Sequence, residues 1–245
     1  NNDGDRPVTI GIVDLPHISN YTDFDALRME PDVSLRIVRT SGDLGNLEAL
    51  IIPGSKNVPS DMEWLRTSQI SAGLIELARK GGTDIAGICG GFQMLGKAIA
   101  DPYMVESGGG ECAGLALLDV CTILGQDKIL KRTEAIHTIS GHKLSGYEIH
   151  HGRTTADAAA VLIVNDKNEP VGVGSADHRI WGTYLHGVFD GDEFRRWFVN
   201  RLRKNKGLTP LAVTTCYDIE PALDRLADVF REAVDVKDLY RLMGL

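Results

Sequence analysis

Cys89 stands in a segment whose residue types suit a nucleophile. Residues 83–96 run from a short apolar strand through a cysteine flanked by glycines into the start of a helix. This is the layout of a nucleophile elbow, with cysteine in place of the serine of G-x-S-x-G. Gly87 and Gly91 permit the sharp turn, because glycine tolerates backbone angles that other residues resist. The helix N-terminus favours an anion, so we expect it to stabilise the Cys89 thiolate.

Such a cysteine needs a base, which is usually a histidine. Among the seven histidines, His186 is the strongest candidate, because it ends the apolar run 180–185 and precedes Gly187. Acyl transfer also needs hydrogen-bond donors for an oxyanion. We expect these donors to be the backbone N–H of Gly90 and the glycine loop at Gly54. The spacing around Gly54 fits a simple tight turn equally well.

The remaining histidines and cysteines give no metal or disulfide pattern. His150 and His151 are adjacent, but no H-E-x-x-H motif or Cys/His cluster accompanies them, so we expect no metal. The four cysteines include no C-x-x-C pair, which suits a reducing cytoplasm. Cys112, Cys121 and Cys216 are interpreted as small apolar fillers or surface thiols.

Strands alternate with helices over the first hundred residues, which predicts an α/β fold with a doubly wound, mostly parallel, flavodoxin-like sheet. The expected strands are 7–15, 33–39, 47–52 and 83–88, and the expected helices are 24–29, 59–78 and 90–99. Thr22 or Asp23 is a plausible N-cap of the first helix. Ligands bind beyond the carboxyl ends of such strands, where Cys89, the 54–55 loop and the turn at 17–23 all fall.

From Gly114 the pattern changes to short strand-like runs at 115–120, 134–139, 146–150 and 170–175, which predicts an antiparallel, β-rich extension packed beside the core. A strand over 180–187 follows, then a helix over 192–203 and an amphipathic helical stretch over 221–243, in one piece or two. We therefore expect a flexible segment 1–7, an α/β core 8–205 and a C-terminal helical segment 206–245.

The net charge of −8 argues against a nucleic-acid partner, because phosphate binding needs clustered cations. The densest basic patch is only 128–132. No apolar run approaches the roughly 20 residues that span a bilayer, and residues 1–7 have no signal-peptide core. We therefore expect a cytoplasmic protein without a membrane partner.

Taken together, the motifs resemble the class I, triad-type glutamine amidotransferases, in their cobyric acid synthase branch. The resemblance is carried by 87–96 and 184–187, and also by 15–27, 53–57, 61–66, 146–154 and 222–228. It implies that Cys89 attacks the side-chain amide of glutamine to form a thioester, and that His186 transfers the protons. It also implies that Gln93 and Arg153 bind glutamine, Arg153 through the α-carboxylate. By residue type alone, Gln93 fits a helix surface and Arg153 a solvated side chain.

The chain departs from the wider class in two places. Many class I enzymes orient the histidine with a glutamate two residues later, but Val188 stands there, and Asp190 is four residues along. The pattern leaves open a Cys–His dyad or an orienting group from elsewhere. No G-x-x-x-x-G-K-[ST] loop is present. The ATP-binding synthetase domain of complete enzymes is therefore expected to be absent from this chain, together with its ATP and Mg²⁺, and no cofactor is expected in this domain.

The resemblance implies a glutaminase domain that supplies ammonia for ATP-dependent amidation of adenosylcobyrinic acid a,c-diamide in cobalamin biosynthesis. Its partners would be glutamine, a synthetase domain or subunit, and a corrinoid acceptor on that partner. Cobyrinic acid a,c-diamide synthase and the amidotransferase of lipid II amidation share the chemistry, but the segments 147–154 and 22–25 favour the first assignment. A catalytically silent binding module is the alternative of a different class, and the intact Cys89, His186 and Gln93 argue against it.

Overall fold

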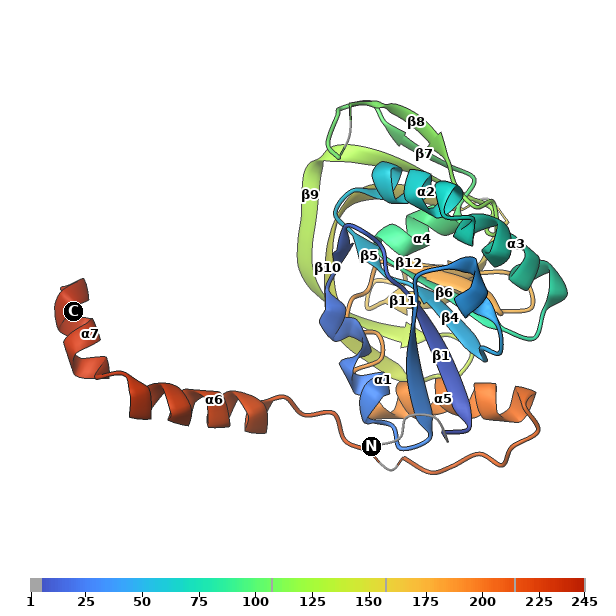
Figure 1. Cartoon of the computed structure of the whole chain (residues 1–245). Coiled ribbons are helices and arrows are strands. Elements are labelled where there is room, and N and C mark those ends of the chain that lie inside the picture. The colour runs from blue at the N-terminus through green and yellow to red at the C-terminus, as the bar shows by residue number, and fades with distance from the viewer. Residues whose placement is uncertain (1–5, 107, 157, 214, 245) are drawn as a thin grey trace. The chain divides into compact units, whose positions relative to one another are not determined.

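The computed structural model describes residues 6–106, 108–156, 158–213 and 215–244 (Figure 1). The chain forms two compact units that divide between Thr215 and Cys216. This boundary lies beyond the expected position 205 because the stretch after the last core helix folds back on it. The Asn200 side chain donates to Leu211 O at 2.7 Å and accepts from Leu211 N at 2.8 Å, and Arg203 Nε donates to Thr209 O at 2.7 Å.

The first unit is built on a sheet whose parallel half confirms the predicted α/β fold. Its parallel strands lie in the order β3 (Val33–Val38), β1 (Val8–Val13), β4 (Ala49–Ile52), β6 (Asp84–Ile88) and β13 (Ile180–Thr183). Every residue of β4 and β6 is buried. Continuous burial is typical of parallel strands covered on both faces, and it explains their unbroken apolar sequence.

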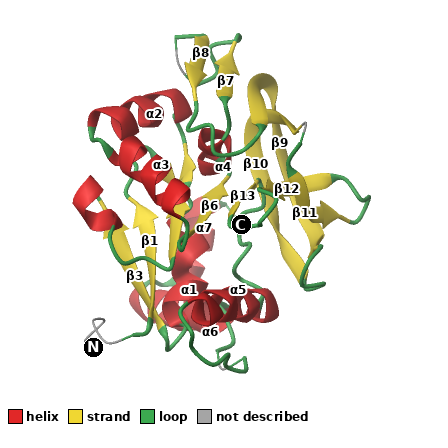
Figure 2. Cartoon of the chain, turned by 90° about the vertical axis from the view of Figure 1, so that its right-hand side faces the viewer, coloured by secondary structure: helices red, strands yellow, loops and turns green. Residues whose placement is uncertain are grey.

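The predicted β-rich extension lies beside the parallel core, as further strands of the same sheet. Strand β13 pairs with β6 on one edge and with β12 on the other, and it therefore joins the two halves. The further strands are β12 (Pro170–Gly174), β11 (Ala160–Asn165), β9 (Val120–His137), β10 (Lys143–Ala156), β7 (Ala98–Asp101) and β8 (Gly110–Ala113). Strands β9 and β10 form one long antiparallel ribbon, which arches along one side of the unit in Figures 1 and 2.

Helices cover the parallel half from two sides, as a doubly wound fold requires. In both views α2 (Val58–Thr67) and α3 (Ile70–Lys80) lie on one side of these strands and α5 (Asp192–Asn205) on the other. The single helix expected over 59–78 is therefore two, because the chain turns at Gln69 with a left-handed φ of 62°. The two short helices are α1 (Asp25–Met29), which follows the 3-10 turn η2 (Tyr21–Phe24), and α4 (Gly90–Leu95).

Three further predictions fail for local reasons. The helix expected over 90–99 ends at Leu95, since residues 98–100 pair with β9 instead. Residues 115–119 are not a strand, because their backbone N–H groups bond to the end of α4, including Leu117 and Leu118 to Leu95 O at 2.9 Å. The run at 146–150 lies within the much longer β10, and the run at 134–139 overlaps only the end of β9, which stops at His137.

The N-terminal end of the described chain is fixed by hydrogen bonds. Residues 1–5 of the expected flexible segment lie outside the described residues. Arg6 and Pro7 are fixed, because Arg6 donates to Val33 O at 2.7 Å and Lys206 Nζ donates to Pro7 O at 2.8 Å.

The second unit contains two helices, α6 (Glu220–Ala233) and α7 (Val236–Met243), and Asp235 caps the second. None of the helices described is long and apolar enough to cross a membrane.

Candidate active site

Cys89 occupies a strained turn between β6 and α4. Its φ of 51° and ψ of −105° lie in a region that residues with a side chain rarely adopt. The neighbouring glycines make the turn possible. A methyl group on Gly87 would lie 2.6 Å from the backbone of Gly91, and one on Gly91 would overlap with the carbonyl oxygen of Ile52. The structure therefore has the strand–turn–helix context that the elbow motif predicts.

Cys89 is a buried thiol. Only 6% of the residue is exposed, and Sγ lies 3.7 Å from Ile149 O. Burial raises the pKa of the Cys89 thiol to about 12, and the backbone N–H of Gly90 offsets this only in part. Desolvation therefore opposes the thiolate form that the helix N-terminus was expected to favour. A base must remove the proton when the sulfur reacts.

Cys89 and His186 follow the ends of two neighbouring strands, β6 and β13. Ile88 and Thr183 are paired residues of β6 and β13, and Cys89 N donates to Thr183 O at 2.8 Å. The two strands run parallel, so Cys89 and His186 both follow the same carboxyl edge. Asn20 lines the cavity of Cys89, and its side-chain Nδ2 lies 3.1 Å from His186 Nε2.

Asp23 orients His186, a role that was not predicted from the sequence. Asp23 Oδ2 lies 2.7 Å from His186 Nδ1, and Asp23 Oδ1 accepts from Gly187 N at 3.0 Å. Both side chains are buried. Asp23 was expected only as an N-cap, but α1 begins after Phe24 without a side-chain cap. The feature that could have predicted this role is the position of Asp23 in the motif 15–27, which falls at the carboxyl edge of the sheet.

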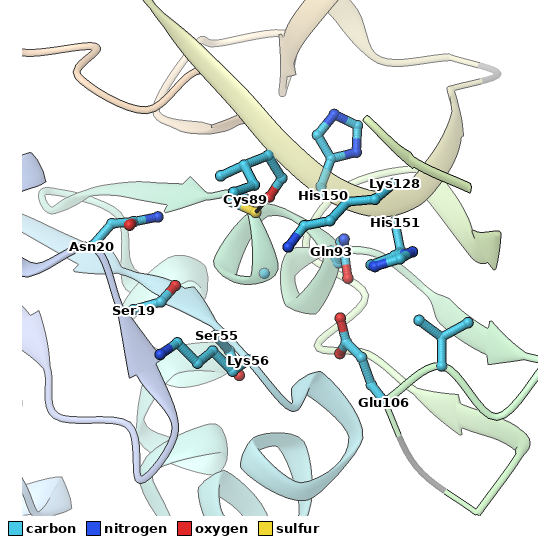
Figure 3. Close-up of a pocket in the computed structure, with 13 residues that line it drawn as sticks. Ser19, Asn20, Ser55, Lys56, Cys89, Gln93, Glu106, Lys128, His150 and His151 are labelled. Carbon is cyan, nitrogen blue, oxygen red and sulfur yellow. Dashed lines mark hydrogen bonds between the residues drawn. The ribbon is translucent and has the colours of Figure 1, made fainter. Parts of the chain in front are cut away.

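A cavity of about 270 Å³ opens on Cys89. Its walls come from the parallel half, the ribbon and the loop after β7 (Figure 3). The lining residues are Ser19, Asn20, Ser55, Lys56, Cys89, Gly90, Gln93, Val105, Glu106, Lys128, Ile149, His150 and His151. The cavity places polar and charged groups within reach of the sulfur, as a site for a small polar molecule requires.

Gln93 is buried in this cavity and is not a helix-surface residue. Only 2% of it is exposed, and its Oε1 has no hydrogen-bond partner within the described part of the chain. Room for its amide exists because the facing residue on β10 is Gly152, where a side chain would overlap with Gln93. A buried carbonyl oxygen without a partner is costly, so it points to a donor on a bound ligand.

Arg153 does not reach the cavity. It is exposed, whereas its neighbours Gly152 and Thr154 contact Gln93 and Tyr184 on the inner side of β10. Successive residues of a strand point to opposite faces, so Arg153 faces outward. The predicted carboxylate contact therefore stays a prediction, because Arg153 does not line the cavity in this structure. The charged groups inside the cavity are Lys56, Glu106 and Lys128, which the sequence analysis did not select.

Glu106 and Lys128 reach the cavity from different elements and point toward the same space (Figure 3). Glu106 accepts a hydrogen bond from Val58 N at 2.9 Å, and burial raises the pKa of its carboxyl group. Lys128 projects from β9. The pair offers one group of each charge to a ligand.

The backbone of Gly90 lies next to the loop 54–55, the two places where oxyanion donors were expected. A methyl group on Gly90 would lie 2.7 Å from Ser55 N, so the nitrogen of Ser55, one residue beyond Gly54, is the loop amide next to Gly90. Gly54 has a different neighbour, because a methyl group there would lie 3.3 Å from His186 Cε1. Gly54 thus leaves space for the imidazole ring.

His150 and His151 have structural partners. His150 Nδ1 lies 2.8 Å from Gly152 O and its Nε2 lies 3.3 Å from Glu148, while His151 Nδ1 lies 3.0 Å from Gly125 O. Within the described residues, no three histidine, cysteine, aspartate or glutamate side chains are grouped to hold a metal ion.

The fold is shared with solved glutamine amidotransferases. A solved glutamine amidotransferase superposes with a TM-score of 0.60 at 18% identity, covering 80% of this chain and 98% of its own. PurLQS from Thermotoga maritima superposes with a TM-score of 0.56 at 19% identity, covering 74% and 87%. Residues 9–194 match the CobB/CobQ-like glutamine amidotransferase domain, and the chain belongs to that family.

Curated relatives extend this match over nearly the whole chain. The adenosylcobalamin biosynthesis bifunctional protein CobDQ of Leptospira interrogans is 48% identical over 96% of this chain and 27% of its own length. The cobyric acid synthases of Nitratidesulfovibrio vulgaris and Salmonella arizonae are 46% and 42% identical, over 99% and 98% of this chain. The chain spans about half the length of these two synthases. The predicted family resemblance is confirmed.

Proposed function

We propose that this chain hydrolyses glutamine to glutamate and ammonia through a thioester on Cys89. The single observation that carries the proposal is the hydrogen-bonded pair of Asp23 and His186 at 2.7 Å, on the strand edge next to the strained Cys89. A nucleophile, a base and a group that orients the base are the three parts that nucleophilic acyl transfer needs.

In the first half of the reaction, His186 Nε2 accepts the proton of the Cys89 thiol while Sγ attacks the side-chain carbonyl carbon of glutamine. The backbone N–H groups of Gly90 and of the loop 54–55 stabilise the negative oxygen that forms. His186 then donates its proton to the amide nitrogen, the C–N bond breaks, and ammonia leaves the thioester. Asp23 keeps the proton of Nδ1 in place and stabilises the imidazolium that forms between these steps.

In the second half, His186 takes a proton from water, and the oxygen attacks the thioester carbon. The C–S bond breaks, the proton returns to sulfur, and glutamate leaves. The raised pKa of Cys89 suits this cycle, because a thiol at rest needs base catalysis in the first half and is readily regenerated in the second.

The cavity also suits the two charges of the free amino acid. We propose that Lys128 pairs with the α-carboxylate of glutamine, Glu106 with its α-ammonium group, and the orphaned Gln93 Oε1 with an N–H of the substrate. Opposite charges on opposite sides of a partly desolvated cavity select a zwitterion over a neutral amide.

The proposed use of the ammonia is amidation of adenosylcobyrinic acid a,c-diamide, with ATP and Mg²⁺ bound by a synthetase partner and the corrinoid on that partner. The names of the relatives and their greater length support this assignment over amidation of cobyrinic acid or lipid II. We propose the cytoplasm as its location, which suits four cysteines that form no disulfide among the described residues.

The test is ammonia release from glutamine by the wild-type chain and by Cys89→Ala, with Cys121→Ala as the matched control at an exposed thiol. We expect C89A to lose activity to the assay limit and C121A to keep it. Labelling with diazo-oxo-norleucine, a glutamine analogue, separates this proposal from a silent binding module. Wild-type protein that neither reacts nor releases ammonia, alone or with a synthetase partner, would favour the silent module.

A further inference from the structure

Gly146 and Tyr147 contact His186 without lining the cavity of Cys89. They belong to the segment 146–154, and they line a second groove of about 850 Å³ between the ribbon and the residues that follow β13. The charged residues of that groove are Lys131, Arg132, Glu134, Lys143 and Asp190. None of the steps proposed above uses Tyr147.

The backbone of Tyr147 is bonded directly to His186. His186 N donates to Tyr147 O at 2.9 Å, and Tyr147 N donates to His186 O at 3.3 Å, as an isolated antiparallel bridge. Gly146 permits this close approach, since a side chain there would overlap with the carbonyl oxygen of His186. The ribbon is therefore attached to the chain at His186 itself.

The Tyr147 ring covers one face of the His186 ring. The two ring centroids are 5.1 Å apart and the planes differ by 19°, so the rings are stacked. Tyr147 is half-buried, whereas His186 has no exposed surface. The tyrosine thus separates the imidazole from the water and charges of the second groove.

The contacts of Asp23 and Tyr147 restrict different motions of His186. The bond from Asp23 to Nδ1 holds one edge of the imidazole, but a single hydrogen bond leaves the ring free to tilt about that bond. A flat partner against the face blocks this tilt. The two contacts restrict different motions, and they act together with Asn20 Nδ2, which lies 3.1 Å from Nε2.

We propose that Tyr147 is a positioning residue for His186, which rests on the proposed glutaminase function. Tyr147 is not one of the residues that line the cavity of Cys89. It acts through His186, by holding the imidazole in the plane that points Nε2 at the sulfur and by excluding groove water. Because the stacked ring and not the hydroxyl does this, phenylalanine should replace tyrosine.

The experiment compares steady-state glutaminase kinetics of Tyr147→Phe, Tyr147→Leu and Tyr147→Ala, with Tyr103→Ala as the control at a tyrosine that is 54% exposed. We expect Y147A and Y147L to lower kcat by about 10- to 100-fold, because small misplacement of a base has effects of this size. Their KM for glutamine should stay within about twofold, since the substrate contacts are elsewhere. Y147F and Y103A should keep the wild-type kcat.

The kinetic pattern distinguishes positioning from a general structural role. If Tyr147 has only a structural role, its substitution lowers the amount of folded enzyme but leaves kcat per labelled active site unchanged. Y147L keeps an apolar side chain, so it provides this measurement if Y147A fails to fold. Wild-type kcat in Y147L, or loss of kcat in Y147F equal to that in Y147A, would overturn the proposal. The proposed glutaminase function is tested separately, because it fails only if the wild-type chain has no activity that C89A removes.

Discussion

The parallel strand ends and the antiparallel ribbon contribute to the site in different ways. Cys89 and His186 are held through backbone, by the register of β6 with β13 and by glycines that leave no room for movement. The ribbon contributes side chains and space. Lys128 lines the cavity with its side chain, and Gly152, which has no side chain, leaves room for Gln93. The parallel half therefore fixes reacting atoms, and the ribbon shapes what can approach them.

This comparison gives each half a kinetic signature. Substitutions at the strand ends should lower kcat, because they disturb groups that act in the transition state. Substitutions on the ribbon's inner face should raise KM. Tyr147 is the informative exception, since it lies on the ribbon but contacts His186, and its substitution should lower kcat.

The largest effect is expected from Asp23→Asn. The amide cannot stabilise an imidazolium and favours the wrong tautomer of His186, so kcat should fall by at least about 100-fold with little change in KM. Ammonia release measured at saturating glutamine gives this value. Asp25→Asn is the matched control two residues later. If D23N retains wild-type kcat, His186 does not depend on Asp23 and the parallel half is less finely fixed than the geometry indicates.

Alanine substitutions at Gly91 and Gly152 should differ mainly in how much they lower the stability of the fold, with a smaller effect on activity than D23N. A methyl group on Gly91 meets the backbone of Ile52, which cannot move aside, so G91A should destabilise the fold by about 3 kcal/mol. A methyl group on Gly152 meets the amide of Gln93 and the hydroxyl of Tyr184, which are side chains and not backbone. G152A should therefore lose less stability than G91A and raise KM as well.

Urea denaturation combined with glutaminase kinetics measures both quantities. Gly45→Ala is the control, because Gly45 has an ordinary φ of −75° and open space around it. Equal stability losses in G91A and G152A would show that the two halves are equally rigid.

The smallest effect distinguishes Lys128 from Arg153 on the same ribbon. K128A removes a cation from the cavity and should raise KM for glutamine about tenfold at nearly constant kcat. R153A removes a cation that faces outward and should leave KM within about twofold. The reverse result would return the carboxylate contact to Arg153 and require β10 to present its other face.

Local patterns were sufficient to predict Cys89, His186 and the parallel half of the sheet. A glycine-flanked cysteine after an apolar strand and a histidine at the end of another are readable within ten residues of chain. The buried strands β4 and β6 are also visible as unbroken apolar runs. These features depend on neighbours in sequence, so they need no knowledge of the tertiary structure.

Asp23, Lys128 and the face of Arg153 could not be read in this way. Asp23 meets His186 across a separation of 163 residues, and only the fold brings them together. The ribbon is exposed along much of its length and carries charges over 126–132, so the alternation that marks a half-buried strand is lost there. Without the strand, the side on which Arg153 lies is undetermined.

The left-handed backbone at Cys89 has an evolutionary consequence. Any residue with a side chain at position 89 carries strain of about 1–3 kcal/mol, whether or not it reacts. The chain therefore gives up stability to keep a thiol at the end of β6. A descendant that had lost the chemistry would gain stability by replacing Cys89 with glycine. Glycine at this position would relieve the strain, whereas the cysteine found here keeps the strain together with the thiol of the proposed nucleophile.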